Sequence, residues 1–251
     1  MDAQALLGRF DREMRADPPP ERGIERAWVD RVLRSTGAYN LIGWWDFPPD
    51  RAREIAEREA AFFHGREVEW KLYSHDRPTR LEQDLEVAGF APVESETFLA
   101  CEVALLADLG TDRVFDVREA LDERGVRDFA AASAEAFGRD EGARLDTWLD
   151  RLDDPDQRLF VAYADGKPVA SARLELPAGR SFAGLYGGGV KPEWRGRGLY
   201  RALVAVRAQE AMRRGYRWLT VDALETSRPI LERLGFEPLA TVCGWTLNAD
   251  A

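Results

Sequence analysis

The stretch that decides the fold runs from Val190 to Tyr200 and reads V-K-P-E-W-R-G-R-G-L-Y. A Gly-rich apolar segment (182–190) precedes it and a segment of helical periodicity follows it, so we expect a strand, a loop and a helix in this order. The first N–H groups of a helix lack acceptors and carry partial positive charge, and glycines let a phosphate approach them. Arg195 and Arg197 are expected to add mobile positive charge. The stretch predicts an anion-binding loop, although a Gly/Arg segment alone is as often a solvated turn.

A second informative segment, 227–236, reads S-R-P-I-L-E-R-L-G-F. Gly235 stands where the end of a helix requires a left-handed residue, and Phe236 would begin the next strand. Together the two segments resemble the acyl-CoA loop and the closing helix of the GNAT N-acetyltransferase superfamily. The loop consensus of that family is V-x-P-x-[YW]-R-G-[RK]-G, and it is matched by Val190, Pro192, Trp194, Arg195, Gly196, Arg197 and Gly198.

This resemblance implies a fold, a cosubstrate and a binding surface. The implied fold class is α/β (α+β), with a mixed, mostly antiparallel sheet flanked by helices over about residues 111–251. The cosubstrate is acetyl-CoA, and no metal is implied. The backbone around Gly189, Val190 and Lys191 would bind the pantetheine arm as if it were another strand. Gly187-Gly188-Gly189 suits this role because glycines permit a bulge and a close approach, or it serves only tight sheet packing. The expected cofactor-binding residues are Gly189, Val190, Lys191, Arg195, Gly196, Arg197, Gly198, Leu199 and Tyr200.

Three positions depart from the family pattern. Tyr200 replaces a small residue, and it would either narrow the pyrophosphate pocket or bring a hydroxyl near a phosphate. Leu231 stands where relatives carry a tyrosine proposed as the general acid. The strand 182–190 contains no carboxylate, although many relatives have one there. The family's usual acid and base therefore cannot be transferred to this chain.

Three other polar residues are the catalytic candidates, and each has a structural alternative. Tyr186 would share a strand face with Gly188 and Val190 and relay a proton, or be a core tyrosine. Glu175 would act as the base, or be a solvent-facing partner of Arg173. Ser227 would lie near the thiol, or only cap the closing helix. Asp222 and Glu225 are candidates for attracting a cationic amine, with solvated strand-end acids as the alternative.

The remaining pattern of the C-terminal part predicts alternating strands and helices. Asp165-Gly166 between apolar runs indicates a hairpin. We expect strands over 114–118, 159–163, 168–176, 182–190, 218–223 and 239–247, and helices over 121–137, 143–152, 199–214 and 227–234.

The first hundred residues contain a second, degenerate copy of the closing segment. Aligning Gly89-Phe90 with Gly235-Phe236 at one constant offset also aligns Asp76, Leu85, Glu86 and Pro92 with identical residues. We therefore predict a tandem arrangement: a degenerate GNAT-like domain over 1–108 and a catalytic domain over 109–251.

The predicted N-terminal domain lacks an anion loop. Where the loop should stand, before a helix over 50–63, the sequence is W-D-F-P-P, which offers a carboxylate and prolines without N–H donors. We expect this domain not to bind acyl-CoA but to wall the substrate cleft. Helices are expected over 3–15 and 21–35, and a strand over 68–74.

Composition limits the functional classes. The 45 acidic against 35 basic residues give a net charge of −10, which argues against nucleic acid as a partner and is compatible with a cationic amine. With no apolar run of membrane-spanning length and no leader pattern, we expect no membrane partner and a cytoplasmic protein. Cys101 and Cys243 are expected to be structural thiols. We expect a monomer, with a homodimer as the alternative.

Three functions fit these observations. The first is an N-acetyltransferase that transfers acetyl from acetyl-CoA to a primary amine of a small molecule. The second is an acyl-CoA-binding sensor or scaffold without turnover, which Leu231 favours. The third is a mycothiol-synthase-like acetyltransferase, which only the tandem layout suggests. Fold analogy does not choose the amine substrate.

Overall fold

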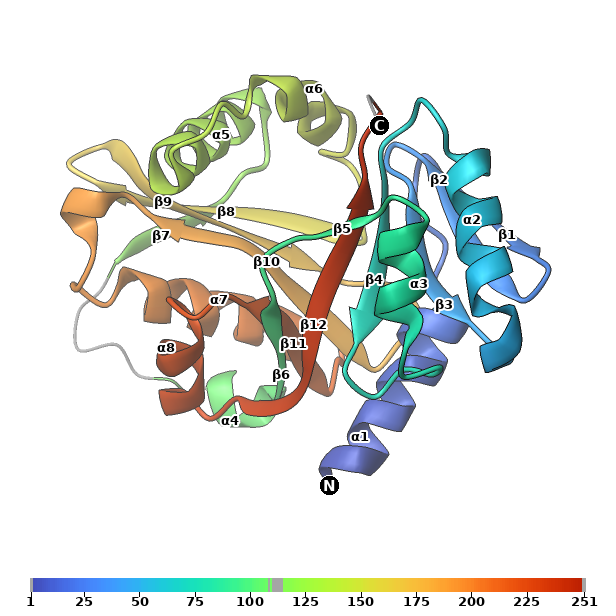
Figure 1. Cartoon of the computed structure of the whole chain (residues 1–251). Coiled ribbons are helices and arrows are strands. Elements are labelled where there is room, and N and C mark those ends of the chain that lie inside the picture. Colours follow the sequence, from blue (N-terminus) through green and yellow to red (C-terminus); the bar gives the residue numbers. More distant parts are fainter. Residues whose placement is uncertain (1, 108, 110–114, 250–251) are drawn as a thin grey trace. The chain divides into compact units, whose positions relative to one another are not determined.

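The computed structural model of the chain (Figure 1) describes residues 2–107, 109 and 115–249. The chain forms two compact units, and neither is one continuous segment. Unit 1 comprises Met1–Leu99, Asp222–Pro229 and Pro238–Ala251, and unit 2 comprises Ala100–Val221 and Ile230–Glu237. The fold class is the expected one, a mixed α/β structure with a mostly antiparallel sheet flanked by helices.

Unit 2 is built on the strand order β11-β10-β9-β8-β7. The pairs β7/β8, β8/β9 and β9/β10 are antiparallel, and β10/β11 is parallel. Helices α5 and α6 lie on one side of these strands and α7 on the other (Figure 1). The elements of this unit are α4 (Val103–Ala107), β7 (Asp116–Glu119), α5 (Glu123–Phe137), α6 (Gly142–Asp150), β8 (Gln157–Ala164), β9 (Lys167–Glu175), β10 (Phe182–Val190) and α7 (Leu199–Arg213).

The predicted elements of this part are confirmed, with small shifts at their ends. The β8/β9 hairpin turns at Asp165 and Gly166, whose φ angles of 49° and 73° are those of a tight two-residue turn. β11 (Trp218–Ala223) and α8 (Arg228–Arg233) also occur where they are expected, and both have residues in each unit. The expected first strand begins at Val114, which lies outside the described residues, and β7 begins at Asp116.

Unit 1 has the strand order β1-β2-β3-β4-β12, in which only β3/β4 is parallel. Trp70 on β4 is fully buried and makes edge-to-face contacts with Trp45 and Phe90. The elements are α1 (Ala3–Phe10), a π-helix η1 (Asp11–Ala16), β1 (Ile24–Val29), β2 (Val32–Gly37), β3 (Leu41–Trp45), a 3-10 helix η2 (Pro49–Arg51), α2 (Ala52–Phe62), β4 (Val68–Tyr73), α3 (Leu81–Val87) and β5 (Ala91–Pro92).

The expected helix over 21–35 is wrong. This segment forms the β1/β2 hairpin, which turns at Asp30 and Arg31 with φ angles of 42° and 69°. Such angles favour glycine, and the turn contains none, so the sequence carries no ordinary hairpin signal there. Ion pairs of Arg51 and Arg58 with the Asp30 carboxylate hold the turn against α2.

The internal repeat is visible in the ends of two helices. Gly89 after α3 and Gly235 after α8 have φ angles of 95° and 100°. The following phenylalanine N–H donates to a leucine carbonyl in both places, Phe90 to Leu85 at 3.0 Å and Phe236 to Leu231 at 3.1 Å. Identical residues at identical spacing thus form the same C-terminal helix cap in both places.

Two strands pass from one unit into the other along the chain. β6 (Glu96–Glu102) begins in unit 1 and ends in unit 2, whereas β12 (Glu237–Leu247) begins in unit 2 and continues in unit 1. There β12 pairs with β4 in antiparallel register, from Val242↔Tyr73 to Leu247↔Val68. The division into functional domains at 108/109 stays a prediction.

Candidate active site

A bulge interrupts β10 at the three glycines of the sequence motif. Tyr186 is opposite Arg173 on β9, but the next aligned pair is Gly189↔Ser171, so β10 holds one extra residue here. Gly187 has a φ of 54°, which a residue with a side chain rarely adopts. The extra residue reverses the alternation of faces, so Tyr186 shares its face with Gly189. The expectation that it shares one with Gly188 and Val190 is wrong.

The other edge of β10 loses its partner before the bulge. The parallel register with β11 runs from Phe182↔Trp218 to Gly184↔Thr220 and ends there. Among the described residues, no strand pairs with β10 on this side from Leu185 to Val190. The N–H and C=O groups of that edge are therefore available to an extended ligand.

The loop after β10 ends in an uncapped helix start. The N–H of Lys191 donates to the carbonyl oxygen of Val169, and a 3-10 helix η3 (Pro192–Trp194) follows. Gly196 and Gly198 have φ angles of 72° and 91°. Gly198 is the N-cap of α7 and supplies no side-chain hydrogen bond. The first N–H groups of α7 therefore have no intrahelical acceptor, as an anion site requires.

The basic side chains of the loop are more constrained than expected. Arg195 donates to two backbone carbonyls and is not mobile. Lys191 is buried and pairs with Glu135 on α5, with Nζ 2.7 Å from Oε1. Arg197 lies over the Trp194 ring at 4.5 Å and donates to the Glu193 carbonyl. Arg195 and Arg197 are both exposed, whereas Lys191 is buried, so the two guanidinium charges are accessible to a bound phosphate.

Tyr200 packs beneath the bulge from the first turn of α7. Its Cε2 is 3.2 Å from the position that a Cβ on Gly188 would occupy. Burial raises the pKa of Tyr200, while the charge of Arg207 acts in the opposite direction. The ring thus fills the space against Gly188, which explains why this position of the chain is large.

The structure brings two of the catalytic candidates together around Arg173. The Arg173 guanidinium lies over the Tyr186 ring at 5.0 Å and pairs with Glu175, with Nη2 3.1 Å from Oε1. All three residues stand on one face of the sheet, since Tyr186 is opposite Arg173 and Glu175 is two residues further along β9. Their catalytic roles stay predictions.

The third candidate, Ser227, belongs to unit 1. Its hydroxyl donates to the Leu224 carbonyl at 3.1 Å, so it stabilises the turn before α8. The same unit holds Asp222, whose carboxylate forms an ion pair with Lys71 at 2.6 Å. Since Lys71 already balances this carboxylate, Asp222 is a weaker candidate for attracting an amine. Leu231 in unit 2 is fully buried and serves the core.

Sequence reasoning missed Arg207, a fully buried arginine on α7. Its Nε donates to the Leu203 carbonyl at 2.9 Å, and its Nη1 donates to the Arg173 carbonyl at 3.1 Å. The signal was its spacing, because Arg207 continues the apolar row of Leu199 and Leu203 in steps of four residues. A charged residue at such a position lies in the core, where charged side chains are rare unless they are paired or have a function.

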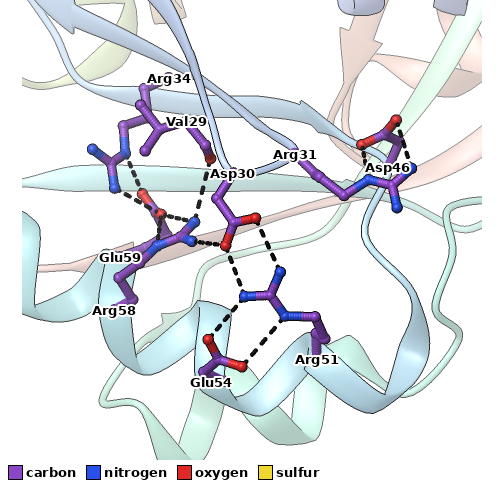
Figure 2. Close-up of polar contacts among 9 residues, drawn as sticks. All are labelled: Val29, Asp30, Arg31, Arg34, Asp46, Arg51, Glu54, Arg58 and Glu59. Carbon is purple, nitrogen blue, oxygen red and sulfur yellow. Dashed lines mark hydrogen bonds and ion pairs between the residues drawn. The ribbon is translucent and has the colours of Figure 1, made fainter.

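The corresponding place in unit 1 has no comparable anion site. Figure 2 shows that Arg51, before α2, is shared between the carboxylates of Asp30 and Glu54. Arg58 also contacts Asp30, and Arg34 forms a buried ion pair with Glu59. These cations are matched by carboxylates. That the N-terminal half does not bind acyl-CoA stays a prediction.

Comparison with protein families gives the C-terminal part its family. Residues 124–236 match the model of the acetyltransferase (GNAT) family. This part of the chain is a GNAT domain. The matched range includes β10 with its bulge, the loop and α7, and it ends at the repeated Gly-Phe. The family resemblance inferred from the loop is confirmed. No match was found among curated proteins.

Solved GNAT structures share the fold across nearly the whole chain. A GCN5-related N-acetyltransferase from Kribbella flavida is 19% identical with a TM-score of 0.69, over 97% of this chain and 93% of that one. One from Sphaerobacter thermophilus is 16% identical with a TM-score of 0.61, over 98% and 92%. A tandem GNAT protein from the clavulanic acid biosynthesis pathway is 16% identical with a TM-score of 0.59, over 92% and 85%. At these identities the similarity shows the fold alone.

The described ranges contain neither a metal-binding cluster nor a membrane-spanning helix. No group of three or more His, Cys, Asp or Glu side chains there is arranged to hold a metal ion. No helix within the same ranges combines the length and apolar character needed to cross a bilayer. Both cysteines are free, and burial raises the pKa of the Cys101 thiol to about 11.

Proposed function

We propose that this protein transfers an acetyl group from acetyl-CoA to a primary amine of a small molecule, by direct attack in a ternary complex. The family and the fold support the coarser function, an acyltransferase. The proposal of acetyl-CoA as the donor rests on one continuous surface. The unpaired edge of β10 runs through the bulge into a loop that ends at the uncapped start of α7. An extended acyl donor with a phosphate end matches this order of groups.

Each part of the surface has a role that follows from its chemistry. The N–H groups at the start of α7, with Arg197 beside them, would bind the pyrophosphate. The edge of β10 at Gly189 and Val190 would hydrogen-bond the pantetheine amides as a neighbouring strand does. The bulge would then face the thioester, where a backbone N–H polarises the carbonyl oxygen.

The reaction requires one bond to form and one to break. The neutral amine nitrogen bonds to the acetyl carbon, the carbon–sulfur bond breaks, and the electron pair leaves on the sulfur. The amine loses one proton and the thiolate gains one. We assign two of the predicted proton-transfer candidates, both in unit 2, with Glu175 as base and Tyr186 as acid. Arg173 contacts both Glu175 and Tyr186, so it holds the two side chains on the same face of the sheet.

A first experiment tests the cofactor site separately from turnover. Acetyl-CoA binding is measured by calorimetry for the unmodified protein and for an Arg195→Ala, Gly198→Glu double variant. The variant places a carboxylate and a side chain at a φ of 91° where the phosphates should bind, so binding should be lost. Equal binding by both proteins would refute the site. A Gly166→Glu variant, which changes a distant hairpin turn, is the control.

A second experiment tests turnover with a panel of amines and measures the release of free CoA thiol. One observation favours the sensor or scaffold function instead: Leu231 is buried and apolar where relatives carry an acid. Tight acetyl-CoA binding without thiol release across amino acids, polyamines and amino sugars would establish that second function. Activity that falls in Tyr186→Phe or Glu175→Gln, with binding unchanged, would support the assigned roles.

The cellular setting is proposed on the same basis. The reaction draws on acetyl-CoA, so the proposed compartment is the cytoplasm, and the proposed partners are acetyl-CoA and the amine. We propose a monomer, and sedimentation of the full chain would test it against a homodimer.

A further inference from the structure

Arg207 holds an unbalanced positive charge inside unit 2. Only 1% of the residue is exposed, and among the described residues no carboxylate forms an ion pair with it. Burial lowers the pKa of Arg207 to about 10, and Tyr200 alone acts in the opposite direction. The guanidinium therefore stays charged near pH 7. A buried charge of this kind costs stability, and carbonyl hydrogen bonds offset only part of that cost.

The guanidinium lies directly under the bulge of β10. Its Nη1 donates to the Arg173 carbonyl on β9 at 3.1 Å and to the Tyr186 carbonyl on β10 at 3.5 Å. These two residues form the last regular pair before the bulge. Arg207 thus ties both strands together at the point where their register breaks.

One nitrogen of the guanidinium is left over. Nη2 is buried and has no hydrogen-bond partner. It lies 3.4 Å from the position that a Cβ on Gly188 would occupy, inside the bulge itself. A Cβ at this position would be in tight contact with both the Tyr200 ring and the guanidinium. The charge is therefore held against the backbone of the bulge and not against another side chain.

We propose that Arg207 is a positioning residue of the acyltransferase site, which fixes the bulge of β10 and strengthens the polarisation of the thioester carbonyl by its backbone. This inference rests on the proposed function. A positive charge beneath the Gly188 peptide favours negative charge on an oxygen bound at the bulge, and the low-polarity surroundings preserve that effect. Its benefit is largest when the carbonyl oxygen becomes an oxyanion, so it acts on kcat more than on KM.

The test combines kinetics with the infrared spectrum of bound acetyl-CoA. Arg207→Met and Arg207→Gln should lower kcat by about tenfold to a hundredfold and leave the KM for acetyl-CoA within about threefold. With acetyl-CoA labelled by ¹³C at the carbonyl, the carbonyl band of the complex should lie at lower frequency than in water. The band should return toward the water value in both variants. Arg207→Lys keeps the positive charge but not the forked guanidinium. Its kcat and its carbonyl band should lie between those of the unmodified protein and those of the other two variants.

Two controls separate these effects from loss of structure. Arg213→Met changes an exposed arginine of the same helix that pairs with Glu210, and it should change neither kcat nor the band. Ethylguanidinium added to Arg207→Ala should restore part of the activity, whereas ethylammonium should restore less. A purely structural role would give neither the frequency shift nor a selective rescue.

The outcomes distinguish failure of the inference from failure of the proposed function. If the unmodified protein does not bind acetyl-CoA, the proposed function fails. If it binds acetyl-CoA with an unshifted carbonyl band, the role of Arg207 is refuted while the binding site stands. Unchanged kcat and band in Arg207→Gln would also refute it. The Gln variant decides the question if Arg207→Met does not fold, because the glutamine amide nitrogen stands where Nε stands and can still donate to the Leu203 carbonyl.

Discussion

Arg195 donates to the carbonyl oxygen of Ala136 at 3.0 Å and to that of Val190 at 3.1 Å. One guanidinium thus joins the last turn of α5 to the end of β10. Arg195, which the sequence predicts to bind phosphate, therefore also holds the loop in its conformation. Phosphate binding and loop stabilisation by Arg195 can be separated experimentally.

We expect Arg195→Gln to weaken acetyl-CoA binding about 5- to 30-fold, because loss of hydrogen bonds from a charged donor costs about 1–2 kcal/mol. In the variant, part of the binding free energy has to be used to order the loop. Since this contribution is conformational and not electrostatic, the difference in affinity between Arg195→Gln and the unmodified protein should persist at high salt. Calorimetry at low and at 0.5 M salt measures it.

Arg197→Gln is the matched comparison. Arg197 is exposed and stacks on Trp194, so its contribution is mainly Coulombic. The defect of this variant should be largest at low salt and shrink as salt screens the phosphate charge. The same salt dependence in both variants would contradict a structural role for Arg195.

We expect Gly189→Ala to destabilise unit 2 by about 1–3 kcal/mol. Its Cβ would lie 2.8 Å from the Cβ of Ala136 and 2.8 Å from the ring of Phe137, so α5 has to move. Urea unfolding measures the loss, and the KM for acetyl-CoA should rise because the loop moves with α5. Gly166→Ala has only backbone strain at a distant turn. It should lose stability without a change in KM.

Asp11 makes the stability of unit 1 dependent on pH in the acid range. Burial raises the pKa of Asp11, but hydrogen bonds with His75 and Arg15 outweigh it, so the pKa is lowered from 3.8. A lowered pKa means that the contribution is complete above the unfolded value and is lost as pH falls through the folded one. Asp11→Asn should therefore cost about 1–3 kcal/mol at pH 7.

The difference between Asp11→Asn and the unmodified protein should shrink below about pH 4. Urea unfolding of both proteins from pH 7 to pH 3 measures it. Asp50→Asn, an exposed acid before α2, is the control. A difference that stays constant over this range would show that the carboxylate charge contributes nothing.

We expect a fragment of residues 109–251 not to fold cooperatively. It lacks Ala100–Ala107, which belongs to unit 2 and buries Val103 and Leu106 almost completely. The fragment also loses the hydrogen bond from the Val103 N–H to the Arg217 carbonyl. Circular dichroism and urea unfolding of the fragment and of the full chain test this. A cooperative transition of the fragment near that of the full chain would refute it.

The sequence was most informative where a structure is encoded locally. The loop, β10 and α7 follow from Pro192, Gly196, Gly198 and the periodic leucines, and Asp165-Gly166 places the β8/β9 turn. These signals depend on the conformations that short segments prefer, so tertiary contacts do not override them.

What the sequence could not provide depends on packing between distant segments. The sequence near Asp30 and Arg31 does not indicate a turn, because the ion pairs that hold Asp30 come from distant residues, Arg51 in η2 and Arg58 in α2. The bulge can be placed within Gly187–Gly189 only once the register with β9 is known. The pairing of β12 with β4 could not be predicted either, since it joins residues that are far apart in the sequence.

That pairing has a consequence for biosynthesis. β4 ends at Tyr73, yet the strand that covers its edge, β12, begins only at Glu237. Until β12 has left the ribosome, β4 keeps one row of peptide groups unpaired, and such an edge attracts other strands. Between the synthesis of these two strands the growing chain therefore has an exposed edge at which aggregation can begin.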